Sequence, residues 1–295
     1  MPTGIPQKSA VPLSSLLLAV IGAVGMATIG VISRITQLTA ESITFYRLGL
    51  GALFLLVYLI ITRRGQHLRH APDWGVVISG GFLAVFILCY VQAMNYTQMA
   101  NAILMVYLAP VFSAVVAHFL FHERLGGAQI ACIAAALFGF AMMQEFHLQL
   151  DGGRDAVGLG FGLLAMLAYS AFILTNRGFP PRTNDRTGAF WQLFFGALVI
   201  LPFALLRPEG LSAEAWQWPW LLGAGLVPGF LALLCAVLAI NRLPTALYGT
   251  LAYCEPLAVV LFGWSLFGEA LTPLQLAGCG VIVASGIVQA RLSQR

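Results

Sequence analysis

The chain has 295 residues, of which 60% are hydrophobic and only 9% are charged. Soluble domains carry about 25% charged residues, so the composition excludes a soluble protein and indicates a membrane protein. The net charge of +4 is not gathered into a basic stripe, and Lys8 is the one lysine, so we expect neither nucleic-acid binding nor an ATP-binding loop.

Ten apolar runs reach the roughly 20 residues that a membrane helix needs. We therefore predict an all-α integral membrane fold of ten transmembrane helices. The first run is longer than the apolar part of a signal peptide and lacks a clear cleavage site, so we expect it to be a span. The predicted helices cover residues 13–33, 42–62, 75–95, 98–121, 126–145, 156–176, 188–206, 219–240, 245–267 and 272–291.

The chain contains an internal duplication. Residues 93–131 align without a gap with residues 239–277, which begin 146 positions later. Shared apolar composition would match Leu and Ala by accident, but not polar and aromatic residues in one register. The matched pairs include Asn95 with Asn241, Tyr107 with Tyr253, Pro110 with Pro256, and Glu123 with Glu269. We therefore predict two five-helix repeats, residues 13–145 and 156–291.

An odd number of spans in each repeat reverses the second repeat relative to the first. We therefore predict two inverted repeats around a central cavity, related by a pseudo-two-fold axis in the membrane plane. With the N-terminus inside, eleven of the 15 basic residues lie on the cytoplasmic side, and Arg34, Arg47, Arg154 and Arg207 lie outside. This positive-inside bias predicts that both termini are cytoplasmic.

Tyr107 and Pro110 lie near the middle of the fourth span, and Tyr253 and Pro256 lie near the middle of the ninth. A proline inside a helix removes one hydrogen bond and kinks the helix, which suits the wall of a wet cavity. We predict that Pro110 and Pro256 are gating bends and that both tyrosines bind substrate. Spans three, four, eight and nine should line the path. The alternative is a kink that only packs its neighbours, with each tyrosine hydroxyl bonded to a nearby carbonyl.

The third span carries an aromatic stripe, Phe82, Phe86 and Tyr90, at helical spacing. Such a stripe is often simply core. Its repeat mates in the eighth span are the small residues Pro228, Ala232 and Ala236. Aromatic rings that face small side chains would leave a flat slot between the two spans. Met26 and Tyr169, aligned in spans one and six, would complete the walls of this slot.

Glu255 is a carboxylate deep in the ninth span, and such acids are costly and commonly functional. It is interpreted either as a coupling acid or as a structural one, with Gln192 or a freed carbonyl as its expected partner. Arg47, the repeat mate of Gln192, either snorkels outward or binds a substrate carboxylate. A structural pair of Arg47 with Glu41 or with the outer loops is the preferred interpretation.

We expect no cofactor and no metal. The five cysteines lie in apolar segments without a C-x-x-C pair. His118 and His122 have a spacing that can hold a metal, but a solvated helix end explains them more simply.

Several motifs together resemble one known family. They are A-x-N-Y-T from Ala93, Y-x-x-P-V-F from Tyr107, F-x-E-R-L from Phe121, Y-x-E-P from Tyr253 and L-F-G-E-x-L from Leu266. The chain resembles the drug/metabolite transporter superfamily, within it the EamA-type ten-helix exporters, and among these the bacterial aromatic amino acid exporters of the YddG type.

The resemblance and the residues together predict a secondary exporter of amino acids, aromatic and other large neutral ones, that works by alternating access. Other small drugs or metabolites are the alternative substrates. A membrane enzyme is less favoured, because no nucleophile with a base stands at membrane depth. A channel is less favoured, because paired kinked helices in inverted repeats argue for a rocking motion. We expect a monomer in the bacterial inner membrane, with the lipid bilayer and a small-molecule substrate as its partners.

Overall fold

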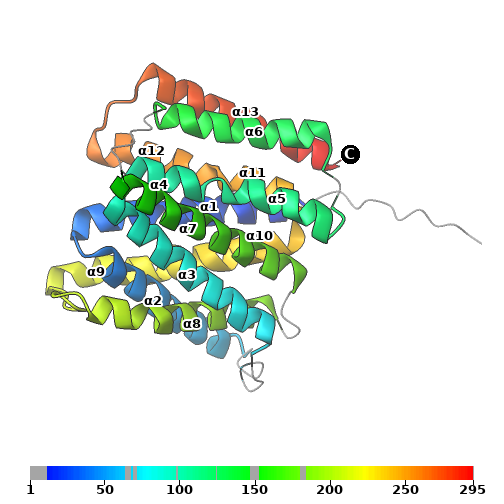
Figure 1. Ribbon diagram of the computed structural model, residues 1–295. Coiled ribbons are helices and arrows are strands. Elements are labelled where there is room, and N and C mark those ends of the chain that lie inside the picture. Colours follow the sequence, from blue (N-terminus) through cyan, green and yellow to red (C-terminus); the bar gives the residue numbers. More distant parts are fainter. Residues whose placement is uncertain are drawn as a thin grey trace, which may run out of the picture.

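A computed structural model describes residues 12–63, 68, 72–97, 99–123, 125–146, 153–179 and 184–294. Within these ranges the chain is helical and contains no strand (Figure 1). Six of the eleven basic residues that were assigned to the cytoplasmic side lie outside the described ranges, namely Lys8, Arg64, Arg69, Arg124, Arg182 and Arg295.

The first half of the chain forms five spans, the fourth of which is split. Its helices are α1 (Leu13–Thr36), α2 (Ala40–Ile61), α3 (Trp74–Tyr96), α4 (Met99–Val106), α5 (Ala109–Leu120) and α6 (Gly127–Met143). The second half repeats this pattern, and here the eighth and ninth spans are segmented. Its helices are α7 (Gly153–Gly178), α8 (Asp185–Leu205), η2 (Ala215–Gln217), α9 (Trp218–Ala224), η3 (Gly225–Leu231), α10 (Ala232–Arg242), α11 (Thr245–Ala252), α12 (Cys254–Phe267) and α13 (Pro273–Gln294).

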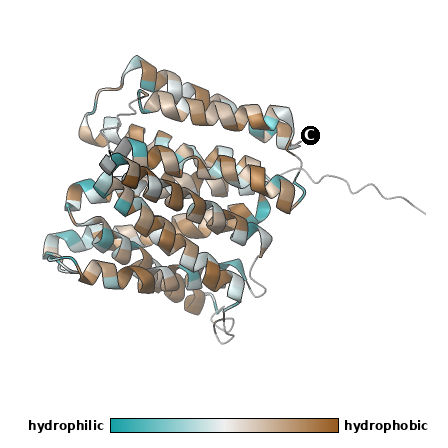
Figure 2. Cartoon of the chain, viewed as in Figure 1, coloured by the Kyte–Doolittle hydropathy of each residue, from teal (hydrophilic) through white to brown (hydrophobic). Residues whose placement is uncertain are grey.

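The all-helical membrane fold predicted from the sequence is confirmed. In the described part of the chain, nine helical stretches are long and apolar enough to cross a membrane, and α6 is a shorter apolar helix of 17 residues. Figure 2 shows apolar residues along most of the length of the helices. Large apolar side chains such as Leu17, Leu53, Phe119 and Trp264 are exposed on the outside of the bundle, where a bilayer would cover them.

The contacts between helices follow the repeat. The mates α2 and α8 pack together, as do α6 and α13, which lie side by side along one edge of the bundle (Figure 1). The remaining contacts come in related pairs: α3 packs on α7 as α10 packs on α1, and both α4 and α5 pack on α7 as α11 and α12 pack on α1. This pairing of contacts is what two repeats related by a pseudo-two-fold axis require.

Small residues set the closest of these approaches. A Cβ atom on Gly139 of α6 would lie 2.8 Å from the carbonyl oxygen of Gly278 on α13. A side chain at Gly139 would therefore push the mated fifth and tenth spans apart.

The bundle has two ends, called proximal and distal. The proximal end is the one at which α1 begins, and α5, α7 and α10 finish there. The distal end is the one at which α1, α3, α8 and α12 finish.

Candidate substrate site

The helix of the fourth span is interrupted next to Pro110. Helix α4 ends at Val106 and α5 begins at Ala109, which leaves Tyr107 and Leu108 between them. A continuous helix would press the Pro110 ring against the carbonyl of Val106. In the first turn of a new helix the missing N–H costs little, because that donor has no partner there. Pro110 therefore lies in the first turn of α5, at the position of the predicted bend.

The ninth span breaks at the matching place. Helix α11 ends at Ala252, α12 begins at Cys254, and Pro256 lies in the first turn of α12. The Tyr253 hydroxyl donates a 2.6 Å hydrogen bond to the main-chain carbonyl of Tyr107. These two tyrosines are repeat mates, so the breaks in the two repeats are bonded directly to each other.

The two tyrosines pack into a core cluster together with the outer spans. The Tyr107 ring lies 4.6 Å from the Phe140 ring and 5.6 Å from the Tyr253 ring, measured between centroids. Tyr253 is 0% exposed and Tyr107 is 7% exposed. In this conformation Tyr253 therefore matches the packing interpretation, with its hydroxyl bonded to a carbonyl. Its role as a substrate ligand remains a prediction.

The aromatic stripe of α3 continues onto α7. Phe86 stacks on Tyr169 with centroids 4.7 Å apart, and on Tyr90 at 6.2 Å. Phe82, Phe86 and Tyr169 are half-buried at the margin of the main apolar core. The structure thus brings Phe86, Tyr90 and Tyr169 together as one stacked aromatic surface.

The small residues opposite do not face that surface as predicted. Ala232 and Ala236 are buried against α1, where a Cβ atom on Gly25 would lie 2.8 Å from the Ala232 Cβ. A Cβ atom on Gly22 would lie 3.2 Å from the Ala236 nitrogen. The repeat pairs bulky residues with bulky ones across α3 and α7, and small with small across α10 and α1. The flat slot between unlike walls was therefore a wrong expectation.

Glu255 lies in the first turn of α12, directly after the break. A carboxylate is favoured there by the helix dipole, which explains how an acid is tolerated in mid-span. It interacts electrostatically with the guanidinium of Arg47 and with the hydroxyl of Tyr107. The break thus places an acid beside the tyrosine pair.

Two expected pairings were wrong. Glu41 pairs with Arg207 instead of Arg47. Gln192 pairs with neutral groups instead of Glu255, since its amide nitrogen donates to the Ser79 hydroxyl at 3.0 Å and to the Asn176 side-chain oxygen at 2.8 Å. Position along a span did not reveal these partners, because they depend on which helices become neighbours.

Repeat-related ion pairs stand at the two ends of the bundle. At the proximal end Glu123 accepts from Arg177 at 2.8 Å and from the main-chain nitrogen of Thr245 at 2.7 Å. At the distal end Glu269, the mate of Glu123, pairs with Arg34, the mate of Arg177. In the proximal pair the side chain of Arg177 is 28% exposed and that of Glu123 is 16% exposed. In the distal pair the side chains of Arg34 and Glu269 are 52% and 48% exposed. The sequence carried a signal for these pairs, because the repeat matches Glu123 with Glu269, and Arg34 with Arg177 at an offset of 143.

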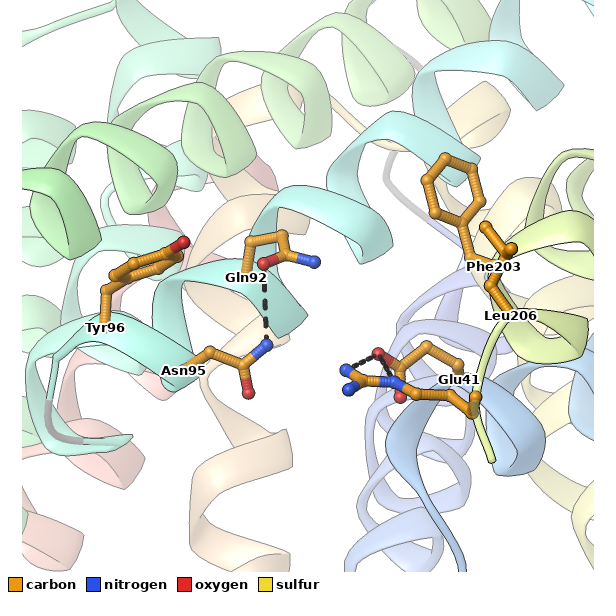
Figure 3. Close-up of a pocket in the computed structure, with 7 residues that line it drawn as sticks. Glu41, Gln92, Asn95, Tyr96, Phe203 and Leu206 are labelled. Atoms are coloured by element: carbon orange, nitrogen blue, oxygen red, sulfur yellow. Dashed lines mark hydrogen bonds and ion pairs between the residues drawn. The ribbon is translucent and has the colours of Figure 1, made fainter. Parts of the chain in front are cut away.

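A cavity of about 430 Å³ opens at the distal end, between the ends of α2, α3 and α8 (Figure 3). It lies away from the aromatic surface and contains none of the predicted substrate residues. The hydrogen bond and negative charge of Glu41 raise the pKa of Arg207 above its ordinary value. The lining residues are Glu41, Gln92, Asn95, Tyr96, Phe203, Leu206 and Arg207.

Taken over the ranges that the structure describes, no group of three or more His, Cys, Asp or Glu side chains is placed to hold a metal ion. His118 instead contacts the main-chain oxygen of Glu123 through its Nδ1 atom, at 2.7 Å.

These features define a membrane protein of two repeated helical units whose broken spans meet at the centre. The sequence profile of the EamA-like transporter family matches residues 13–144 and 156–289. The chain belongs to this family and is a multi-pass membrane transporter.

Two relatives show which activities are known among similar proteins. The threonine/homoserine exporter RhtA of Escherichia coli K12 is 26% identical over 291 residues, covering 94% of this chain and 90% of RhtA. The pseudopaline exporter CntI of Pseudomonas aeruginosa is 23% identical over 281 residues, covering 94% of this chain and 96% of CntI. The narrower resemblance to the YddG type stays a prediction.

A solved crystal structure has the same fold. It superposes with a TM-score of 0.83 and covers 96% of this chain and 99% of that one, at 22% identity.

Proposed function

We propose that the protein exports neutral α-amino acids, preferring those with aromatic or other large apolar side chains, by alternating access. The observation that carries the proposal is the meeting of two broken, repeat-related spans at the Tyr253–Tyr107 hydrogen bond. Broken helices at the interface of inverted repeats are where transporters of this architecture bind substrate.

Alternating access needs a closure at each end of the path. The Glu123–Arg177 pair links α5 to α7, and Glu123 also holds the start of α11, so three spans are tied at the proximal end. The Arg34–Glu269 pair links α1 to the end of α12 in the related way. We propose that one pair opens while the other closes. The distribution of basic residues supports a cytoplasmic proximal end, with both termini on the cytoplasmic side of a bacterial inner membrane.

The stacked surface of Phe86, Tyr90 and Tyr169 favours a substrate with a flat or bulky apolar side chain. Aromatic pairs contribute about 0.5–1.5 kcal/mol beyond burial of area. No pair of basic side chains stands at this surface in the described residues, so phosphorylated substrates lack the clamp that they require. The amino-acid exporter RhtA among the relatives supports the substrate class.

The substrate preference is tested by replacing Phe86 with Ala in cells challenged with toxic analogues of phenylalanine and of threonine. We expect Phe86→Ala to lose protection against the aromatic analogue by roughly 3- to 10-fold and to change threonine-analogue protection much less, because only stacking is removed. Phe119→Ala is the matched control, since Phe119 is 72% exposed on the lipid-facing side. Equal loss for both analogues would contradict the aromatic preference.

A further inference from the structure

The cavity at the distal end has a charged wall and an apolar wall (Figure 3). On the charged wall Glu41, which is 5% exposed, pairs with Arg207. The apolar wall is formed by Phe203 of α8 and by Leu206 just after it, and both are exposed on the outside of the bundle. A molecule with a charged head and apolar chains would meet matching surfaces on both walls, with its head in the cavity and its chains in the bilayer.

The ion pair on the charged wall uses half of its hydrogen-bonding groups. Arg207 donates through Nε, at 2.9 Å, and through Nη2, and both bonds end on the same oxygen of Glu41, Oε1. Within the described ranges Oε2 of Glu41 accepts no hydrogen bond, and Nη1 of Arg207 donates none. The pair therefore offers a ligand one charged acceptor and one charged donor.

Two amide side chains of α3 face the ion pair across the cavity (Figure 3). Their one mutual contact is long, since the Asn95 amide nitrogen donates to the Gln92 Oε1 atom at 3.5 Å. The Gln92 amide nitrogen donates to no group in the part of the chain that the structure describes. The repeat mate of Gln92 is Leu238, so this polar group belongs to the distal end alone.

The repeat also shows why Asn95 is left open to the cavity. Its mate at the proximal end, Asn241, donates to the carboxylate of Asp185 at 2.9 Å. At the offset of 145 that relates α2 to α8, Asp185 corresponds to Ala40, which has no polar side chain. The first repeat thus lacks the partner that holds the amide in the second, and the cavity is a departure from the repeat rather than a product of it.

The cavity lies at the depth of lipid headgroups. The chain that follows its wall carries three exposed tryptophans, Trp216, Trp218 and Trp220. Tryptophan and tyrosine gather where a membrane meets water. The Tyr46 hydroxyl donates a 2.5 Å hydrogen bond to the carbonyl of Leu211, and its ring lies 5.6 Å from that of Trp218, which fixes this segment against α2.

We infer that the cavity binds the headgroup of a zwitterionic phospholipid that carries a primary ammonium group. The ammonium group donates to Oε2 of Glu41, and the phosphate accepts from Arg207 and from the Gln92 amide. A quaternary ammonium group cannot donate a hydrogen bond, and a glycerol headgroup has no positive charge, so neither satisfies Glu41 as well. A free amino acid has the same pair of charges, but the exposed apolar wall favours a lipid. The inference goes beyond the proposed transport and does not depend on it.

Three lipids with identical dioleoyl chains separate the two interactions: phosphatidylethanolamine, phosphatidylcholine and phosphatidylglycerol. Native mass spectrometry of the purified protein in detergent compares their binding. The unaltered protein should bind phosphatidylethanolamine roughly 10-fold more tightly than the other two, the effect of one hydrogen bond to a charged group. Glu41→Gln should abolish this preference. Gln92→Leu, which copies the repeat mate, should weaken binding of all three lipids by a similar factor, because each carries the phosphate.

Gln92→Leu leaves the ion pair intact, so it tests the site even if Glu41→Gln does not fold. Glu214→Gln is the matched control, since it removes a distal carboxylate that bonds to Trp216 outside the cavity, and it should keep the preference. Equal binding of the three lipids by the unaltered protein, a preference that survives Glu41→Gln, or unchanged binding by Gln92→Leu would overturn the inference. Displacement of the bound lipid by free L-phenylalanine would also overturn it, and would assign the cavity to a soluble amino acid instead.

Discussion

Glu123 joins three spans through one side chain. Glu123 follows the end of α5. Its carboxylate accepts hydrogen bonds from Arg177 on α7 and from the main-chain nitrogen and hydroxyl of Thr245 at the start of α11. It thereby satisfies a main-chain donor at a helix start that has no partner within the helix. Its repeat mate Glu269 pairs with Arg34, whose guanidinium also lies 4.4 Å from the Phe267 ring centroid.

The unequal surroundings of these two carboxylates lead to a prediction. Glu123→Gln should lower the free energy of unfolding by about 1.5–3 kcal/mol, the usual worth of hydrogen bonds to a charged group. Glu269→Gln should lower it by about 0–1 kcal/mol, because water screens that exposed pair. Unfolding of the two purified variants in the same detergent measures the difference. Equal losses would show that the proximal pair is no stronger than the distal one.

Single residues also show where sequence reasoning reached its limit. The repeat identified Tyr107, Tyr253 and both prolines, because identical residues recur in one register. The partner of Glu41 was not predictable in this way, since Arg207 lies 166 residues away and becomes a neighbour only when α2 and α8 pack together.

At the scale of elements, the ten predicted spans agree with the helices of the structure to within a few residues, because long apolar runs between short polar loops leave little freedom. The segmentation of the eighth span was not predicted. There the chain forms the π-helical segment η3 around Pro228, between Gly225 and Gly229, where α2 crosses closely. A π-helical turn depends on that crossing, which apolar periodicity does not report.

The broken spans give the prediction at this scale. Pro110→Ala and Pro256→Ala should each reduce transport severalfold while leaving the amount of protein in the membrane nearly unchanged, because alanine allows the helix to close across the break. Pro202→Ala is the control, since that proline lies inside the last part of α8 and away from either break. Wild-type flux in both break variants would remove the gating role.

At the scale of the whole molecule, inverted repeats place the α7–α8 connection and the α6–α7 connection on opposite sides of the membrane. Single cysteines at Asp185 and Arg154, introduced into a variant without the five native cysteines, test this arrangement. In whole cells an impermeant thiol reagent should label the cysteine at Arg154 and spare the one at Asp185. Labelling at Asp185 would contradict the inverted arrangement with its proximal end in the cytoplasm.

Alternating access exposes one substrate site to the two sides of the membrane in turn. Exchange in liposomes that contain the purified protein tests this most directly. Uptake of labelled L-phenylalanine should saturate, and it should accelerate when the liposomes are preloaded with unlabelled phenylalanine, because the loaded site returns faster than the empty one. Uptake that rises linearly with concentration and does not respond to preloading would contradict alternating access and would indicate a channel.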